Sequence, residues 1–204
     1  MEIKQATEFG EEIREKISEL FVDAFSKELK FVKNSDLRKA LISASTHLFD
    51  PKHVWLAVID GEIAGMVDCY AKNEVPPKLR KREFIKRFGI VSGLLIGFLL
   101  GHYYRKSTFK KIPTAITSEK AAAVQMVATS PKLQGKGVAT TLLNFVHAQP
   151  EYDTFILEVL DTNTNAFELY KKLGYKEIYR KKATKFERQG GMNYFLYLKY
   201  TKNS

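Results

Sequence analysis

Residues 131–139 of this 204-residue chain read Pro-Lys-Leu-Gln-Gly-Lys-Gly-Val-Ala. They lie between an apolar run at 124–129, typical of a strand, and an apolar pattern at 140–147, typical of a helix. A turn at this place presents consecutive backbone N–H groups at a helix N-terminus, where the helix dipole favours negative charge. Gly135 and Gly137 keep side chains away from the backbone, and Lys136 adds a positive charge. The stretch therefore predicts a pyrophosphate-binding turn.

Two common phosphate-binding motifs do not fit this turn. A Walker loop needs a glycine five residues before Gly135, where Ser130 stands, and a Ser or Thr directly after Lys136. The dinucleotide fingerprint needs a third glycine at Thr140. The spacing that fits is Gln-x-x-Gly-x-Ala, at 134–139. It resembles the Gln/Arg-x-x-Gly-x-Gly/Ala motif of the GCN5-related N-acetyltransferase (GNAT) superfamily, which grips the pyrophosphate of acetyl-CoA.

A second segment, at 155–175, resembles the same superfamily. An apolar run predicts a buried strand over 155–160, and apolar residues at i, i+3, i+4 and i+7 predict a helix that follows it. The superfamily has Asn-x-x-Ala-x-x-x-Tyr-x-x-x-Gly-Phe/Tyr at this place. The matching residues are Asn163, Ala166, Tyr170, Gly174 and Tyr175. With both motifs in order, the chain is identified as a member of the superfamily.

The periodicity of the remaining chain agrees with this fold. The expected class is α/β (α+β): a mixed, mostly antiparallel central sheet flanked by helices, with a helical insertion between the third and fourth strands. We expect one acetyltransferase domain over 1–204, with the insertion at 72–120. Strands are expected at 2–6, 53–59, 62–70, 122–129, 154–160, 175–182 and 192–200, and helices at 11–25, 35–48, 137–148 and 163–173.

The resemblance implies that acetyl-CoA is the acyl donor. Backbone N–H groups at 127–129 are expected to pair with the pantetheine arm and the acetyl carbonyl, and the turn is expected to hold the pyrophosphate. Asn163 resembles the position that binds the pantetheine arm, although a helix N-cap is an equally simple role for it. The expected cofactor-binding residues are Val127, Ala128, Thr129, Gln134, Gly135, Lys136, Gly137, Val138, Ala139, Thr140, Asn163 and Tyr170.

Two side chains are expected to carry the chemistry. Tyr170 stands where the superfamily has its general acid, which protonates the departing CoA sulfur; the alternative is an aromatic residue that closes the core. Glu158 is a carboxylate within an otherwise apolar strand. The spacing of Glu158, Asn163 and Tyr170 is similar to that in the bacterial ribosomal-protein N-terminal acetyltransferases, where this glutamate acts as the base through water. The alternative is a glutamate that faces solvent or forms a salt bridge.

Composition limits the remaining choices. The chain is 45% hydrophobic, as a globular protein is, and the single Cys69 excludes an internal disulfide. Together with an N-terminus unlike a signal peptide, this predicts a cytoplasmic protein. The histidines do not have metal-ligand spacing with Cys69, so no metal is expected. The amine acceptor stays open among peptide N-termini, lysine, polyamines, aminoglycosides and amino-acid derivatives, and a homodimer is also open.

The insertion at 72–120 distinguishes this chain from a simple acetyltransferase core. Residues 88–104 contain no Lys, Arg, Asp or Glu, and glycine recurs every four residues from Gly89 to Gly101. The surrounding 72–111 segment carries eleven Lys or Arg against two Glu, a net charge of +9. Three readings compete: an arm packed on the core, a peripheral membrane contact through 76–111, and a full membrane span. Nucleic-acid binding is not expected, because no recognition motif accompanies the charge.

The predicted function is therefore transfer of an acetyl group from acetyl-CoA to a primary amine by direct attack in a ternary complex. A different class also stays open. The chain is alternatively a CoA-binding or membrane-associated regulatory module that has the same fold and little turnover.

Overall fold

The computed structural model describes residues 1–24, 35–74, 118–189 and 191–202, together with 82, 85–86, 88–90 and 93. Most of the 72–120 segment, including Gly97, Gly101 and most of the basic flanks, lies outside the described residues. Its three readings therefore stay predictions. No helix in the described part of the chain is both long and apolar enough to cross a membrane.

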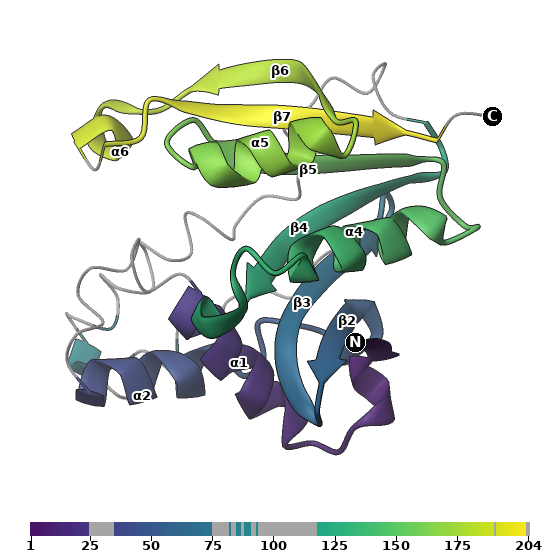
Figure 1. Ribbon diagram of the computed structural model, residues 1–204. Helices are drawn as coiled ribbons and strands as arrows, with labels where there is room; N and C mark the ends of the chain where they lie inside the picture. Colours follow the sequence, from purple (N-terminus) through teal and green to yellow (C-terminus); the bar gives the residue numbers. More distant parts are fainter. Residues whose placement is uncertain are drawn as a thin grey trace. The chain divides into compact units, whose positions relative to one another are not determined.

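Seven strands form one sheet. They are β1 (Glu2–Gln5), β2 (Val54–Ile59), β3 (Glu62–Ala71), β4 (Ala121–Thr129), β5 (Thr154–Leu160), β6 (Lys176–Lys182) and β7 (Tyr194–Thr201). Their order across the sheet is β1-β2-β3-β4-β5-β7-β6 (Figure 1). β4 and β5 are parallel, whereas β1–β2, β2–β3, β5–β7 and β6–β7 are antiparallel. This confirms the predicted mixed, mostly antiparallel sheet.

The helices occupy the predicted places, with one addition. They are α1 (Ile13–Ala24), α2 (Ser35–Ser45), α4 (Val138–Ala148), α5 (Thr164–Lys172) and α6 (Lys185–Gln189), with short 3-10 turns η1 (Ala6–Glu8), η3 (Pro51–His53) and η6 (Pro131–Leu133). Helix α4 supplies the crossover that a parallel β4–β5 pair requires. Outside the 72–120 insertion, every predicted helix and strand is present, with its ends within three residues of the expected ones. Helix α6 was not predicted.

The chain divides into two compact units. Unit 1 comprises Met1–Asp68, Val75–Ser107 and Met126–Leu142, and unit 2 comprises Cys69–Glu74, Thr108–Gln125 and Leu143–Ser204. The division passes through β3, β4 and α4. That both units belong to one acetyltransferase domain, with an insertion at 72–120, stays a prediction.

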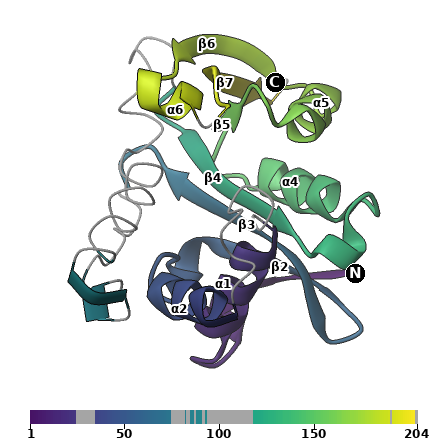
Figure 2. The ribbon, with the colours of Figure 1, turned by 90° about the vertical axis from the view of Figure 1, so that its left-hand side faces the viewer.

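In unit 1, α1 and α2 lie beside each other and bury their apolar faces (Figure 2). Ile13, Ile17 and Leu20 follow the spacing of one helix face, and each is less than a tenth exposed. The β2–β3 hairpin turns at Asp60 and Gly61, whose φ angles of 50° and 82° are both left-handed. An Asp-Gly pair favours this turn because its twist matches that of the flanking strands.

Gly65 of β3 marks a close approach within unit 1. A Cβ atom at this position would lie 2.8 Å from the carbonyl oxygen of Ala128 and 2.7 Å from Cγ1 of Val138. We therefore expect Gly65→Ala to lower the free energy of unfolding by about 2–3 kcal/mol, because a backbone carbonyl in a sheet cannot move aside. Urea denaturation measures this loss. Gly10→Ala is the control: its Cβ would meet only the flexible carboxylate of Glu12, so its cost should stay below about 1 kcal/mol.

In unit 2, β7 lies between β5 and the edge strand β6, and α5 packs against β5 (Figures 1 and 2). Phe155 pairs with Tyr200 on the face toward α5, since the Tyr200 ring contacts Tyr175, just after that helix. Side chains alternate along a strand. Glu158 and its cross-strand partner Tyr197 therefore lie on the opposite face of the sheet.

Candidate active site

The turn before α4 has the conformation that its glycines predict. Gly135 and Gly137 adopt φ angles of 78° and 82°, in the left-handed region that favours glycine. A Cβ atom at either position would meet nothing within 4 Å, so both residues border open space. Gln134 and Lys136, which alternate with them, are exposed. We call residues 134–137 the glycine loop.

The glycine loop leads directly into the N-terminus of α4. The first hydrogen bond of the helix runs from the Thr141 N–H to the Gly137 carbonyl, at 3.0 Å. The N–H groups at 138–140 precede it and therefore have no carbonyl partner within the helix. Together with the helix dipole and the Lys136 ammonium, these N–H groups make a site suited to a phosphate or pyrophosphate. Unit 1 thus brings together all the residues expected to hold the pyrophosphate.

The second half of β4 contains 127–129, where backbone donors to the acyl group are expected. Register pairs between β4 and β5 run from Ala121–Thr154 to Val124–Leu157. Both strands continue beyond the last of these pairs, β4 to Thr129 and β5 to Leu160. Ala128 is buried, whereas Val127 and Thr129 are partly buried. The assignment of their N–H groups stays a prediction.

Asn163 caps α5. Its Oδ1 atom accepts a hydrogen bond from the Ala166 N–H at 3.3 Å, and its carbonyl accepts the N–H of Phe167 at 3.0 Å. The cap is one of the two roles expected for Asn163, and this geometry accounts for it. A contact with pantetheine stays a prediction.

Tyr170 is held at the C-terminal end of α5. The Tyr175 N–H bonds to the Tyr170 carbonyl and the Gly174 N–H to the Lys171 carbonyl, both at 3.0 Å, while Gly174 has a φ of 90°. These two bonds form a Schellman motif, as the glycine predicted. The Tyr170 ring lies 5.6 Å from the Tyr175 ring and is 8% exposed. Burial raises the pKa of the Tyr170 phenol to about 12, so it keeps its proton throughout the physiological pH range.

Glu158 is partly buried on β5 and directly faces Tyr197 of β7. The Tyr197 hydroxyl donates a hydrogen bond to the Glu158 carboxylate. Tyr197 is fully buried, and burial first, then the nearby carboxylate, raise the pKa of its phenol well above the usual range. Its proton therefore stays in place as a hydrogen-bond donor. The sequence did not identify this partner, which lies 39 residues away.

Within unit 2, Glu158 and Tyr170 lie on opposite faces of the sheet. Groups on two faces can act on one substrate only around an edge of the sheet. Glu158 is the first residue of β5 beyond the last register pair with β4, which involves Leu157.

His147 lies in a buried aromatic cluster of unit 2. Its Nε2 atom is 2.8 Å from the Tyr175 hydroxyl, and its ring stacks on Tyr200 at 4.1 Å. Burial, and then the positive charge of Lys202, lower the pKa of His147 to about 4. A neutral ring fits this place, since Nε2 then accepts the Tyr175 proton. His147 is thus a core histidine, and its partners come from distant elements.

This low pKa predicts acid sensitivity. Above pH 6.5 His147 is neutral in both states and contributes no pH dependence. Between pH 6.5 and about 4, the unfolded chain binds a proton that the folded chain excludes, so stability falls as the pH falls. Between pH 6.5 and about 4, the free energy of unfolding of His147→Phe should fall by about 2–3 kcal/mol less than that of the parent. Urea denaturation at pH 7, 5.5 and 4 measures both slopes, and parallel slopes would contradict the assignment.

The described residues include no group of three or more His, Cys, Asp or Glu side chains that could hold a metal ion.

Comparisons with known proteins found similarity in both sequence and fold. The model of the acetyltransferase (GNAT) family matches residues 12–175. No curated protein sequence is significantly similar. An N-acetyltransferase from Staphylococcus aureus Mu50 has a similar fold, with a TM-score of 0.60, 16% identity, and coverage of 98% of this chain and 100% of that chain.

Two further solved structures are similar in fold. The histone acetyltransferase HPA2 and related acetyltransferase from Corynebacterium glutamicum has a TM-score of 0.60 at 19% identity, over 99% of this chain and 96% of that chain. The ribosomal-protein-S18-alanine N-acetyltransferase from Escherichia coli has a TM-score of 0.55 at 13% identity, over 100% of this chain and 94% of that chain. From the family match over most of its length and from this shared fold, the chain belongs to the acetyltransferase (GNAT) family.

Proposed function

We propose that this protein transfers an acetyl group from acetyl-CoA to a primary amine by direct attack within a ternary complex. The observation that carries the proposal is the glycine loop, in which two left-handed glycines precede the N-terminus of α4. N–H groups at 138–140 and the Lys136 ammonium suit the pyrophosphate, and acetyl-CoA supplies the activated thioester. Membership of the family supports the same donor.

The remaining roles follow from the chemistry of acyl transfer. Glu158, through water, takes the proton that the attacking amine loses as its C–N bond forms. Backbone N–H groups at 127–129 stabilise the negative charge on the acyl oxygen; one such donor is typically worth about 10²–10³ in rate. Tyr170 donates a proton to the sulfur as the C–S bond breaks. The products are an amide and free CoA thiol, so no other reactant is required.

The position of Glu158 supports its role as the base. A charged side chain inside an apolar strand needs a compensating partner, and Tyr197 supplies a hydrogen bond that keeps the carboxylate in one orientation. The need for a base depends on the acceptor. At pH 7, about one lysine side chain in a few thousand is neutral, compared with roughly one α-amine in ten.

We therefore expect the loss of activity in Glu158→Gln to depend on the amine acceptor. With a lysine acceptor at pH 7 its kcat/KM should fall by about 10²–10³, and with an α-amine by about 10. In both cases activity should recover as the pH rises, since the amine then deprotonates in solution. Release of CoA thiol over pH 6–9 measures both effects. Glu168→Gln is the control, because Glu168 is exposed on α5 and, among the described residues, bonds to Lys171 alone.

The same assay tests the proposed function itself. A panel of peptides, lysine derivatives, polyamines and aminoglycosides should include at least one acceptor that accelerates CoA release. A protein that binds acetyl-CoA but releases no CoA with any of them is instead the regulatory module. We also propose that the protein works in the cytoplasm.

A further inference from the structure

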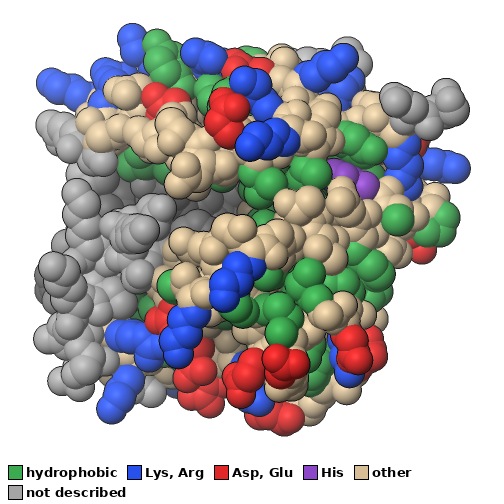
Figure 3. Space-filling model, viewed as in Figure 1, with side chains coloured by type: hydrophobic (Ala, Val, Ile, Leu, Met, Phe, Trp, Pro, Cys, Tyr) green, Lys and Arg blue, Asp and Glu red, His purple; other side chains and the backbone are tan. Residues whose placement is uncertain are grey.

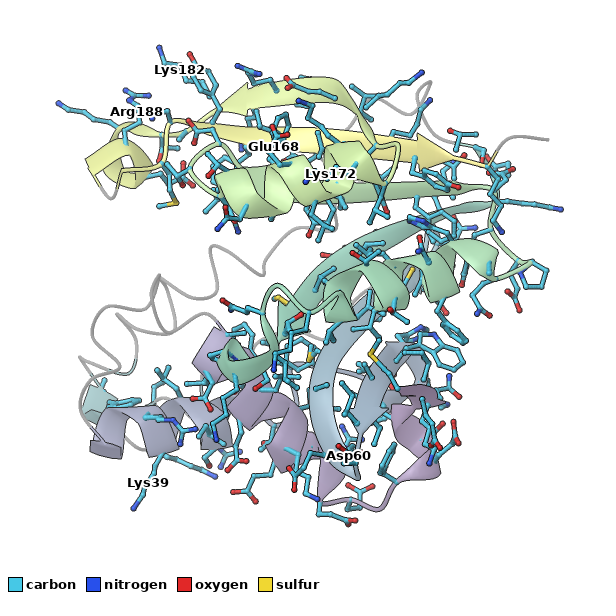
Figure 4. The ribbon with its side chains drawn as sticks, in the orientation of Figure 1. Lys39, Asp60, Glu168, Lys172, Lys182 and Arg188 are labelled. Carbon is cyan, nitrogen blue, oxygen red and sulfur yellow. The ribbon has the colours of Figure 1, made fainter. Side chains whose placement is uncertain are left out.

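A second basic segment lies at the C-terminal end of unit 2. Residues 164–202 carry ten Lys or Arg against three Glu, a net charge of +7. All three Glu are already engaged: Glu168 pairs with Lys171, Glu177 pairs with Arg180, and Glu187 is buried and bonds to the Thr184 N–H. Lys and Arg side chains accordingly gather along β6 and α6, where Lys182 and Arg188 point outward (Figures 3 and 4). The charge of the Lys and Arg side chains that are not paired with these Glu therefore remains available to an anionic partner.

Strand register concentrates part of this charge on one face of the sheet. Lys176 of β6 lies directly opposite Lys199 of β7. Further along β6, Tyr179 lies opposite Tyr197 and Lys181 lies opposite Phe195. None of these three lysines forms an ion pair within the described residues. Cross-strand partners share a face, so the three lysines belong to the face opposite α5, where Lys176 is exposed and Lys181 and Lys199 are partly exposed. We call Lys176, Tyr179, Lys181 and Lys199 the lysine–tyrosine face.

Protection of the sheet edge does not explain this arrangement. Lysines on edge strands commonly prevent strands of other molecules from pairing, and Lys176 and Lys181 on β6 could serve this purpose. Lys199, however, lies on β7, which is an interior strand. Two like charges directly opposite each other destabilise a sheet. An anion bound between Lys176 and Lys199 would turn this repulsion into attraction.

An exposed aromatic ring lies among the lysines. Tyr179 is 37% exposed and is one of only three large hydrophobic side chains exposed in the described part of the chain. One side of its ring contacts Tyr197, at 5.5 Å between ring centres. The strand register shifts between Glu177 and Tyr179, so Lys176, Tyr179 and Lys181 face Lys199, Tyr197 and Phe195, which follow one another at two-residue steps of about 7 Å along β7. A ring between two cations matches a chain of alternating phosphates and bases.

We propose that the lysine–tyrosine face binds single-stranded nucleic acid, with phosphates at Lys176, Lys181 and Lys199 and a base stacked on Tyr179. Stacking on aromatic side chains within a basic surface is how proteins bind single strands without sequence preference. An acidic peptide would use the lysines equally well, but it offers nothing to stack on the exposed ring. No linear motif signals this surface, because its members meet only through pairing of β6 with β7.

Fluorescence anisotropy of the full chain with a labelled 12-nucleotide oligouridylate, without acetyl-CoA, tests the proposal. Three phosphate contacts predict a slope of log affinity against log salt of about −2, since each contributes roughly −0.7 in single strands. Lys176→Ala/Lys199→Ala should weaken binding at least tenfold and reduce the slope by about 1.4. Tyr179→Ala should weaken binding about tenfold with the slope unchanged. The double variant should be at least as stable as the parent, because the repulsion is removed.

The matched control is Lys39→Ala/Lys52→Ala, which removes two positive charges from unit 1 and should leave binding unchanged. Equal losses in the two double variants would mean that only net charge matters, and this would overturn the proposal. Failure to bind the oligonucleotide would also overturn it. If oligoglutamate competes for the face as strongly as oligouridylate does, and Tyr179→Ala has no effect on binding, the face would be assigned to an acidic protein instead. Thymidylate of the same length separates DNA from RNA. Because no acyl transfer is measured, each result is independent of the proposed function.

Discussion

Gly137→Glu is expected to weaken acetyl-CoA binding by about 100-fold or more. Gly137 has a φ of 82° and its carbonyl accepts the first hydrogen bond of α4, so any side chain here borders the helix N-terminus. A glutamate would place a negative charge where the pyrophosphate is expected and would occupy the open space beside the backbone. A 100-fold loss corresponds to about 2.7 kcal/mol of binding free energy.

Thermal unfolding with and without acetyl-CoA measures this loss. Ligand at about 100 times its dissociation constant stabilises the parent by roughly 2.7 kcal/mol. For a chain of this size the midpoint should rise by about 5–10 °C. The same ligand concentration should leave the midpoint of Gly137→Glu nearly unchanged.

Gly61→Glu provides a control with the same backbone strain. Gly61 also has a φ of 82°, and a Cβ atom there also meets nothing within 4 Å, but it lies in the β2–β3 hairpin. Both variants should lose about 1–2 kcal/mol of stability from the left-handed conformation. Only Gly137→Glu should lose the shift on ligand addition. If both variants keep the shift, acetyl-CoA binds away from the glycine loop.

The two superfamily motifs and the sequence periodicity together predicted the fold class and the places of the helices and strands. Local chemistry agrees with them: the Asp60-Gly61 pair favours the hairpin, Gly174 favours the end of α5, and the apolar repeat of α1 forms its buried face. Helix α6 was missed because five residues carry too little periodicity. Its one local signal was the capping box of Thr184 and Glu187, in which each side chain accepts the other's backbone N–H.

Contacts between distant segments could not be predicted from one sequence. Glu158 was identified as an unusual charge in a strand, but Tyr197 became its partner only through the β5–β7 register. The partners of His147 could not be identified from the sequence, because Tyr175 and Tyr200 lie 28 and 53 residues further on. The lysine–tyrosine face depends on register in the same way. The sequence therefore identified candidate functional side chains, whereas strand pairing determined which of them contact each other.

Tyr170→Phe is expected to lower kcat by about 10²-fold and to leave the affinity for acetyl-CoA nearly unchanged. Phenylalanine keeps the ring that packs on Tyr175, so the variant loses only the hydroxyl. Proton donation by a positioned side chain typically contributes about 10²–10⁴ in rate. A single-turnover measurement separates this chemical step from binding. An unchanged kcat would leave Tyr170 as an aromatic residue of the core.

The contribution of Tyr170 to the rate should depend on the pKa of the leaving thiol. Burial raises the pKa of Tyr170 to about 12, whereas a thiol such as that of CoA has a pKa near 8.5. Full transfer of the proton to a free thiolate is therefore uphill by roughly 3.5 pKa units, or about 5 kcal/mol. Donation is favourable only while the C–S bond breaks and the sulfur is still held beside the phenol. The contribution of Tyr170 should accordingly shrink as the leaving thiol becomes more acidic.

Acetyl thioesters with thiols of decreasing pKa can test this dependence. The ratio of parent to Tyr170→Phe rates should fall toward one along the series, because an acidic thiolate departs without a proton. Tyr175→Phe is the matched control, since it removes another buried hydroxyl, the one bonded to His147. It should lower stability and give a ratio that does not vary with the leaving group. A constant ratio for Tyr170→Phe as well would mean that its hydroxyl supports the structure and does not protonate the sulfur.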